Sequence, residues 1–418
     1  MAEKKAYTQA VRTGLYYKPP GLLGKYDNVR RFWEDQVTGI FLRPALNDLA
    51  ERKKQRLQRV RILDLGCGSG DGYDLLMGVA TKDPGIYEYI TSAITEDMLR
   101  EYVGVDINED LLEQARANYG RFPKTRFLQG DLSECLPPSI LEEEPFDIYF
   151  TSYGTLSHFH DDQNVKLISG ICKHAPQRAL FIGDWLGRYS YEWRDLWHHP
   201  ADEEYFMDYR ISYFITDDEE EKNDVPIFPL RLITRDEIMQ IVNRAAEESG
   251  VEIRPVAFFD RSLLIGRHME TGDYNNNCPK LRTAVNSLFE PYLRTDLESL
   301  LVDYVPRPGF DHLNNFFEMF FLCCNTLVRH TISLLNTYSS EQESESPFDV
   351  LPFFPDPLKE AMHTMRRIIE GVGWLKWGDA RANIIEPHLG FSLRKLEMDL
   401  QPGTGMGHGL VGIFEIRK

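Results

Sequence analysis

The sequence predicts an α/β protein in which a doubly wound parallel sheet is followed by a mainly helical C-terminal region. Residues 61–70, RILDLGCGSG, indicate a buried strand that breaks into a glycine-rich turn. Further short apolar strands alternate with helical patterns as far as about residue 270, which is typical of a parallel sheet with helices on both faces. Beyond that point, longer helical patterns replace this alternation.

The N-terminal segment, residues 1–60, is expected to form an arm and cap helices ahead of the sheet. Residues 1–24 end in Pro-Pro-Gly, and residues 26–49 carry the apolar stripe of a helix. The first residues, MAEKKAYTQAV, lack the apolar run of a secretory signal peptide. The six cysteines form no C-x-x-C pair and no zinc-ligand spacing, so we expect free thiols, no metal site and a cytoplasmic protein.

The first strand is apolar throughout except at Asp64, as expected of a central strand buried on both faces. Glycines follow at every second position, at Gly66, Gly68 and Gly70. Glycine tolerates positive φ and allows a ligand to lie directly on the backbone. The turn is therefore a candidate binding loop.

Three further strands end at residues that can contact a ligand. A second strand ends at Asp106, a third at Asp131 and a fourth at Tyr153. Ligands of doubly wound sheets bind beyond the carboxyl ends of the strands, at the point where the strand order reverses. We expect these residues to lie together at that edge of the sheet.

At these positions the chain resembles the class I S-adenosylmethionine-dependent methyltransferases. Asp64-Leu-Gly-Cys-Gly-Ser-Gly70 matches the first motif of that family, an acidic residue followed by G-x-G-x-G. The resemblance covers roughly residues 25–270. It implies a Rossmann-like, seven-stranded methyltransferase sheet, with S-adenosyl-L-methionine as cofactor and S-adenosyl-L-homocysteine as product.

Two other glycine-rich loops fit less well. A nicotinamide-binding loop needs G-x-G-x-x-G, and here the third glycine comes one position too early. A Walker loop needs Gly-Lys-Ser/Thr, and no lysine follows Gly70 or Gly72.

The resemblance also implies which residues contact the cofactor. In the family, the acidic residue that ends strand two holds the ribose hydroxyls, and the aspartate after strand three meets the adenine amino group. The implied cofactor residues are Asp64, Gly66, Cys67, Gly68, Gly70, Asp106, Ile107, Gly130, Asp131, Leu132, Ser152, Tyr153, Tyr26 and Arg30. Arg30 or Arg31 could pair the methionine carboxylate, because arginine binds carboxylates with two hydrogen bonds. The alternative is that both are surface groups.

Methyl transfer from a sulfonium mainly requires alignment, because the leaving group is already activated. A general base is needed only for a poor nucleophile. The segment after strand four faces the methyl group in this family, so Tyr153 and His158 are candidate catalytic residues, with His160 as an alternative base. Asp184, at the end of strand five, could orient the acceptor or could cap the turn around Gly183. The histidines could equally be packed loop residues.

The sheet domain is expected to span residues 61–270. A capping box at Thr234 begins a helix that ends at Gly250. Residues 251–259 and 262–267 would then form the final antiparallel pair of strands. The aromatic-rich insertion 187–230 could be a lid over the acceptor or a small subdomain with its own core.

Residues 271–418 are expected to form a mainly helical C-terminal domain with a closing β-hairpin. Its predicted helices are 281–304, 312–338 and 355–370. The hairpin would pair 392–400 with 409–416 around the glycine-rich residues 401–407, which we interpret as a flexible turn. The apolar helical segment 316–328 must be covered, by the other helices, by the sheet or by a second subunit in a homodimer.

Composition narrows the range of functions. The net charge of −18 and the isoelectric point of about 5.1 oppose nucleic-acid binding, which depends on Lys and Arg. The apolar segment 316–328 is too short to span a membrane. We therefore predict a methyltransferase that acts on a small-molecule acceptor, with the O, N or C acceptor atom left open. The alternatives are a protein or RNA methyltransferase, and a non-catalytic S-adenosylmethionine-binding protein with an interaction module.

Overall fold

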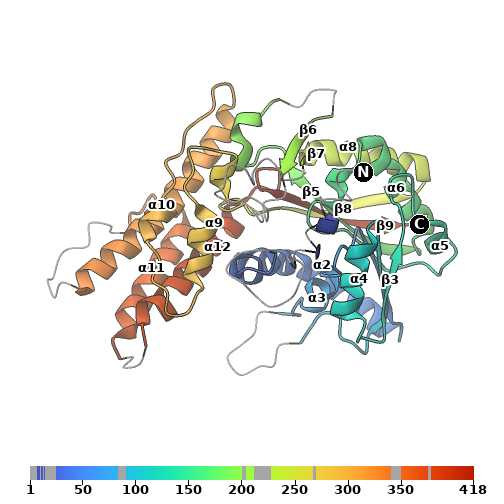
Figure 1. Cartoon of the computed structure of the whole chain (residues 1–418), viewed down its shortest axis with the longest axis horizontal. Coiled ribbons are helices and arrows are strands. Elements are labelled where there is room, and N and C mark those ends of the chain that lie inside the picture. The colour runs from blue at the N-terminus through green and yellow to red at the C-terminus, as the bar shows by residue number, and fades with distance from the viewer. Residues whose placement is uncertain are drawn as a thin grey trace.

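The computed structural model describes residues 7–9, 11–12, 14, 25–82, 91–199, 204–210, 227–266, 270–339, 350–374 and 378–418. Figure 1 shows an α/β sheet part beside a group of helices that lies beyond one end of the sheet.

The central sheet confirms the predicted doubly wound fold. Its first five strands are β1 (Val60–Leu65), β2 (Leu99–Asp106), β3 (Thr125–Gln129), β4 (Ile148–Phe150) and β5 (Arg178–Gly187). They run parallel in the order β3-β2-β1-β4-β5, so their carboxyl ends share one edge. Every residue of β1 is buried, because alternate side chains enter the cores on the two faces of the sheet.

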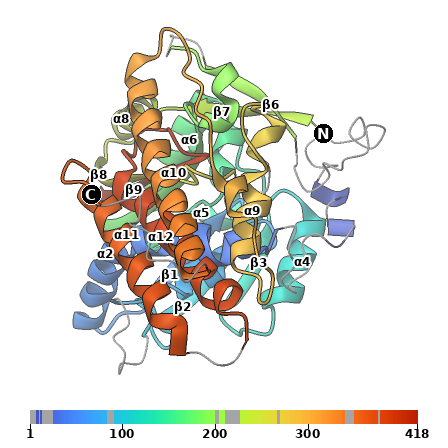
Figure 2. The same cartoon turned by 90° about the vertical axis from the view of Figure 1, so that its left-hand side faces the viewer.

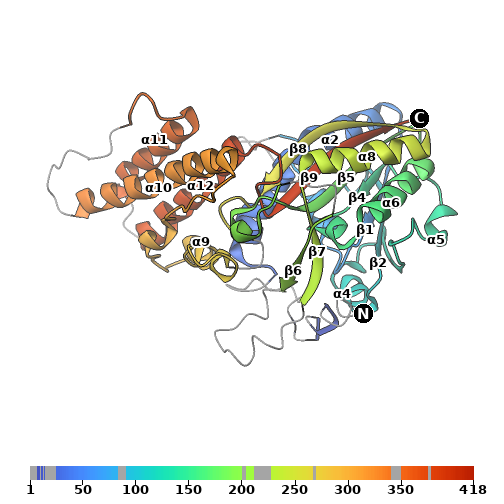
Figure 3. The ribbon, with the colours of Figure 1, turned by 90° about the horizontal axis from the view of Figure 1, so that it is seen from above.

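Helices cover both faces of this sheet (Figure 3). One face packs against α2 (Asp35–Gln55), α3 (Gly72–Met77) and α4 (Glu109–Tyr119), and the other against α5 (Pro138–Leu141), α6 (Asp161–His174) and α8 (Arg235–Ser249). A short π-helical turn, η1 (Arg30–Glu34), precedes α2. The predicted capping box begins α8, since Thr234 and Glu237 bond each other's backbone, and Gly250 with φ of 68° ends it.

The last two strands of the sheet differ from the prediction. The strand β8 (Glu252–Arg261) forms as expected, but its partner is β9 (Gly409–Arg417), which lies antiparallel between β5 and β8. Residues 262–266 leave the sheet because the left-handed Ser262, with φ of 62°, turns the chain. The expected pairing of 251–259 with 262–267 was therefore wrong.

The predicted closing hairpin was wrong in its first strand and its pairing, although its second strand, 409–416, is confirmed by β9. Residues 392–400 belong to the helix α12 (Glu386–Leu400). The leucines at 389, 393, 396 and 400 repeat every three to four residues, which is the period of a helix and not of a strand. Residues 401–407 are not a flexible turn either, because four of their amides donate to the buried carboxylate of Asp260.

The helical region is thus an insertion between β8 and β9 and not a terminal extension. It contains α9 (Leu281–Leu288), α10 (Asp311–Ser339), α11 (Asp356–Gly371) and α12, which Figure 2 shows in front of the sheet. The predicted helices 312–338 and 355–370 are confirmed by α10 and α11. The predicted helix 281–304 ends early, because Pro291 cannot continue it, and a short turn η6 (Leu297–Leu300) follows.

The connection after β5 adds two strands at the carboxyl edge. It contains η3 (Tyr191–Leu196), β6 (Phe206–Arg210) and β7 (Ile227–Ile233), and β7 pairs with the end of β5. In the described part of the chain the sheet therefore has nine strands, the seven of the order β3-β2-β1-β4-β5-β9-β8 plus this pair.

The aromatic side chains of this connection face the helical region. Tyr191 and Trp197 are buried, with ring centroids 4.9 Å from Phe321 and 5.5 Å from Phe317 on α10. They join the two parts of the molecule and do not form a separate core. Tyr213, Phe214 and the acidic run 217–221 lie outside the described residues. Within the described ranges, no helix has both the length and the apolar character needed to cross a membrane.

Candidate functional site

The glycine-rich loop after β1 is open at Gly68, while side chains cover the positions next to Gly66 and Gly70. Gly66, Gly68 and Gly70 have φ of 70°, 52° and 85°, in the left-handed region that favours glycine. The amides of Gly66 and Cys67 donate to the carbonyl of Val105 on β2, at 2.8 and 3.0 Å, which fixes the loop on the sheet. No described atom lies within 4 Å of the position that a Cβ would take on Gly68.

Asp106, at the end of β2, joins this loop. Its Oδ2 accepts a hydrogen bond from the amide of Gly68 at 2.9 Å, and its Oδ1 accepts one from the amide of Asn108 at 2.8 Å. Each carboxylate oxygen can accept a second hydrogen bond. The position suits two adjacent hydroxyl groups of a ribose.

The neighbouring residues provide an apolar and a polar surface. Ile107 is 48% exposed although it is a large apolar side chain. Gly130 donates from its amide to the carbonyl of Asp106 at 3.0 Å, which brings the turn after β3 beside it. Leu132 is buried there, and the exposed Asp131 accepts a hydrogen bond from the amide of Ser133 at 2.9 Å. This arrangement suits a flat base with an exocyclic amino group.

Asp64 lies on β1, shortly before the glycine loop. Its side chain is fully buried, Oδ2 contacts the hydroxyl of Tyr102, and Oδ1 has no hydrogen-bond partner among the described residues. Burial raises the pKa of Asp64 to about 7, and the nearby charges of Asp106 and Asp71 act in the same direction.

The segment before α2 is fastened to the glycine loop by ion pairs. Lys25 lies 2.6 Å from Asp71, and the hydroxyl of Tyr26 donates to the same carboxylate at 2.7 Å. Arg30 is buried, 3.4 Å from Asp71, and its guanidinium lies 4.5 Å from the ring centroid of Tyr153. Arg31 is exposed, so Arg30 is the arginine that faces inward. The sequence-based prediction missed Lys25 and Asp71.

Tyr153 and Asp184 meet at the loop after β4. Tyr153 has φ of 59°, which is strained for a tyrosine. Asp184 accepts hydrogen bonds from the amides of Tyr153 at 2.7 Å and Gly154 at 3.1 Å, and it pairs with the buried Arg261 at 2.9 Å. Asp184 therefore holds the strained loop, and the turn that it caps lies at 153–154 and not at Gly183.

The two candidate histidines have different surroundings. His158 ends the short helix η2 (Thr155–His158), and its ring lies 5.6 Å from that of Phe228 and 6.2 Å from that of Tyr7. His160 is exposed at the start of α6, and its Nδ1 lies 2.6 Å from Glu204. His158 thus belongs to an aromatic cluster at the carboxyl edge, while His160 belongs to an ion-pair network.

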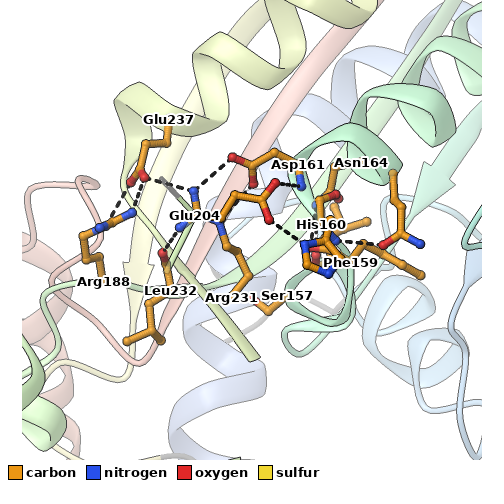
Figure 4. Close-up of polar contacts among 12 residues, drawn as sticks. Ser157, Phe159, His160, Asp161, Asn164, Arg188, Glu204, Arg231, Leu232 and Glu237 are labelled. Carbon is orange, nitrogen blue, oxygen red and sulfur yellow. Dashed lines mark hydrogen bonds and ion pairs between the residues drawn. The ribbon is translucent and has the colours of Figure 1, made fainter. Parts of the chain in front are cut away.

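Figure 4 shows this network, which was not predicted. Arg231 on β7 pairs with Asp161 at 2.9 Å and with Glu237 at 3.0 Å, and Arg188 also donates to Glu237 at 3.0 Å. Both arginines are buried. The network ties β7 to the ends of β5, α6 and α8, and it thereby fixes Phe228 of β7 beside η2.

Comparison with known protein families gives one match, over part of the chain. Residues 88–176, which include β2, β3, β4 and α6, match the sequence family described as a methyltransferase domain. The glycine loop at 66–70 lies outside the matched residues, so the two observations are independent. No curated protein has a significant sequence match to the chain.

Several solved structures are similar over part of the chain. The protein solved with the Trm112 methyltransferase activator of Haloferax volcanii is 14% identical with a TM-score of 0.30, and the similarity covers 50% of this chain and 66% of that one. Magnesium protoporphyrin IX methyltransferase from Synechocystis PCC 6803, with bound SAH, is 14% identical (TM-score 0.34; 64% and 92% covered). The CcbJ methyltransferase from Streptomyces caelestis is 16% identical (TM-score 0.37; 61% and 89%). Scores this low carry no inference about an acceptor.

Proposed function

We propose that this chain, a class I S-adenosylmethionine-dependent methyltransferase, transfers the methyl group to a small-molecule acceptor. The observation that carries this proposal is the crowding of the carboxyl edge by three segments from distant parts of the chain. Tyr7 of the N-terminal arm lies 5.8 Å from the ring of Phe228, and Thr8 donates to Asp110 at 2.6 Å. The connection after β5 and the helical region lie at the same edge.

Such surroundings favour a small acceptor over a polymer. A protein or RNA substrate needs an open, extended surface, and RNA also needs basic side chains to meet its phosphates. The net charge of −18 opposes the second requirement.

The cofactor would lie along the glycine loop and across the ends of β2, β3 and β4. Asp106 would accept hydrogen bonds from the ribose, and Ile107, Gly130, Asp131 and Leu132 would surround the adenine. The backbone of the loop, Asp64 through Gly70, would contact the methionine portion, and Arg30 and Tyr26 would lie at its carboxylate with Lys25. When bound, S-adenosylmethionine supplies a methyl group on a positively charged sulfur that leaves readily.

The acceptor would lie on the side of Tyr153, Ser152 and His158. Tyr153 would border the methyl group, because its loop follows β4 at the carboxyl edge and its ring lies beside Arg30. We assign Asp184 a positioning role, since its carboxylate acts through the amides of Tyr153 and Gly154.

Isothermal titration calorimetry and a labelled transfer assay test this function. We expect the full chain to bind both S-adenosylmethionine and S-adenosylhomocysteine. With a radiolabelled methyl group and a cell lysate as the acceptor source, we expect label in the small-molecule fraction. Label in protein or RNA would overturn the acceptor class. Cofactor binding without transfer to any fraction would favour a non-catalytic binding protein.

A further inference from the structure

Arg261 lies at the point where the helical insertion leaves the sheet. It is the last residue of β8, and it pairs in register with Gly409, the first residue of β9. Residues 262–408 therefore leave and rejoin the sheet at this pair. The function proposed above gives neither residue a role.

Arg261 contacts the loop of Tyr153 in two ways. Its side chain is fully buried, and its Nη2 atom donates to the two carboxylate oxygens of Asp184 at 2.9 and 3.2 Å. The same carboxylate accepts hydrogen bonds from the amides of Tyr153 and Gly154. The Cζ atom of Arg261 also lies 4.9 Å from the centroid of the Tyr153 ring. Arg261 therefore acts on the backbone of this loop through Asp184 and on the tyrosine ring directly.

The insertion and β9 fix Arg261 from the other side. The turn after Arg261 begins at Ser262, which has φ of 62°. The buried carboxylate of Glu397, on α12, accepts hydrogen bonds from the amides of Ser262 and Leu264, both at 3.1 Å. A Cβ on Gly409 would lie 2.9 Å from Cζ of Arg261, so the guanidinium lies directly on the backbone of β9. Together, α12 and β9 determine where the guanidinium lies.

Other buried arginines of the chain are bonded more completely. Arg231 and Arg282 donate from all three of their guanidinium nitrogens. The Nε and Nη1 atoms of Arg261 have no hydrogen-bond partner among the described residues. Unsatisfied buried donors lower the stability of the fold, and so does the left-handed Tyr153, with φ of 59°. Such costs are typical of functional sites, where the surrounding structure holds an unfavourable geometry.

We propose that Arg261 is a positioning residue, through which the helical insertion holds Tyr153 in the geometry that methyl transfer requires. The insertion then contributes to turnover in addition to covering the site. Alignment of the acceptor with the methyl carbon is the main requirement of the reaction, and a displacement of about 1 Å can lower a rate about 10²-fold. This inference rests on the proposed function, because it takes Tyr153 as the residue that borders the methyl group.

Three substitutions disturb this arrangement from different sides. Arg261→Gln removes the guanidinium, while Arg261→Lys keeps a positive charge for Asp184 but loses the planar group. Glu397→Gln leaves Arg261 intact and replaces one of the two oxygens that hold the turn after it. Gly409→Ala also leaves Arg261 intact, and its added methyl group displaces the guanidinium.

The chain provides a matched control for each kind of change. Arg61, near the amino end of β1, is buried, pairs with two glutamates at 2.8 Å, and has its Cζ 4.2 Å from the ring centroid of Phe146. Arg61→Gln therefore removes the same kind of group at the opposite end of the strands. Glu386 on α12 is buried and accepts a hydrogen bond from the amide of Thr295 at 2.8 Å. Glu386→Gln thus changes a carboxylate that is bonded within the insertion.

The first measurement is hydrogen exchange of the peptide that contains residues 153–158, read by mass spectrometry, together with calorimetry of S-adenosylhomocysteine binding. We expect Arg261→Gln and Glu397→Gln to speed exchange of the amides that Asp184 accepts about tenfold, as for loss of about one hydrogen bond to a charged group. The affinity for S-adenosylhomocysteine should change less than about twofold, because the glycine loop and Asp106 are untouched. Both controls should keep the wild-type exchange of this peptide.

The second measurement is the rate of label transfer into the small-molecule fraction of the lysate, at saturating S-adenosylmethionine. We expect Arg261→Gln to lower this rate about 10–100-fold, and Glu397→Gln and Gly409→Ala to lower it less. Arg261→Lys should recover part of the rate, because its ammonium keeps the ion pair with Asp184. Arg61→Gln and Glu386→Gln should transfer label at the wild-type rate per folded molecule, even where they lower stability.

The outcomes separate the two claims. If the wild type transfers no label to small molecules, the proposed function fails, and the inference that rests on it fails with it. If the wild type is active and Arg261→Gln and Glu397→Gln match their controls in exchange and in rate, the positioning role is overturned. A loss of stability in Arg261→Gln without a loss of rate per folded molecule also overturns it. Should Arg261→Gln fail to fold, Glu397→Gln decides between these results, because Arg261 is intact in that variant.

Discussion

Residues 66–70 and residues 401–407 are two glycine-rich loops near the carboxyl edge of one sheet, and their backbones face different partners. In the first, no described atom lies within 4 Å of a Cβ placed on Gly68. In the second, the carboxylate of Asp260 accepts hydrogen bonds from the amides of residues 404–407, at 2.8–3.2 Å. A Cβ on Gly405 would lie 2.9 Å from the carbonyl oxygen of Ile233.

The difference shows that glycine spacing indicates a close approach to the backbone but does not identify the partner. For the first loop we propose the cofactor as the partner, because Asp64 precedes the loop and Asp106 ends the next strand. For the second loop the partner is Asp260, 144 residues before Thr404. The first loop is open at Gly68, where we propose that a ligand lies, while the second is filled by the protein's own carboxylate and anchors the start of β9.

The largest effect is expected from removal of the carboxylate at the second loop. Asp260→Ala leaves the amides of residues 404–407, three of them buried, without this acceptor, and we expect a loss of about 3–5 kcal/mol in the free energy of unfolding. Chemical denaturation measures this loss. Asp131→Ala, which removes an exposed carboxylate at the same edge, should change stability by less than about 0.5 kcal/mol. Equal stability of the two variants would contradict the structural role of Asp260.

The corresponding change at the first loop should act on the cofactor. Asp106→Ala should weaken binding of S-adenosylmethionine and S-adenosylhomocysteine by about 1.5–3 kcal/mol, the range for lost hydrogen bonds to a charged group. Titration calorimetry measures the two affinities. Glu113→Ala, at an exposed position on the next helix α4, is the control and should retain both affinities. If Asp106→Ala bound the cofactor like the wild type, the first loop would not be the cofactor site.

The first loop and its strands could be predicted because their signals are local. Each of the first five strands contains at least two consecutive apolar residues, and their parallel direction follows from the intervening helices. The strand β9 was predicted at 409–416, but its partners could not be, because pairing with β5 depends on contacts across more than two hundred residues. Helix α12 could have been predicted from its leucine spacing. Nothing in the sequence predicts the 2.6 Å contact between Glu192 on η3 and His408 before β9, because the two residues meet only in the folded chain.

A pH-dependent effect on stability is expected from the proton on Asp64. Because burial raises the pKa of Asp64 to about 7, the folded protein keeps a proton that the unfolded chain, with an aspartate pKa near 3.9, loses above about pH 4. This contribution to stability is complete below pH 4 and is lost as the pH rises towards 7, with a slope of at most about 1.4 kcal/mol per pH unit.

Denaturation of the wild type and of Asp64→Asn between pH 4 and pH 8 isolates this term. The asparagine does not titrate, so the difference between the two curves should change across that range and level off above pH 7. Glu397, whose pKa burial also raises to about 7, remains in both proteins and cancels in the comparison. If the two stability curves ran parallel between pH 4 and pH 8, burial would not raise the pKa of Asp64.

The smallest effect on stability, and the sharpest contrast between the loops, is expected from single alanine substitutions. Gly68→Ala forces a left-handed residue at φ of 52° but meets no described neighbour, so it should cost about 1–2 kcal/mol of stability. Its methyl group would occupy the space where the cofactor meets the backbone, so binding of S-adenosylhomocysteine should fall far more than stability does.

Gly405→Ala is the matched change in the second loop, and there the added Cβ meets backbone, so it should lower stability more and cofactor affinity less. Chemical denaturation should therefore show the larger loss of stability in Gly405→Ala, while calorimetry should show the larger loss of cofactor affinity in Gly68→Ala. If both variants lost stability and affinity in the same proportion, the two loops would form one coupled unit, and the distinction between a ligand-filled and a protein-filled loop would be wrong.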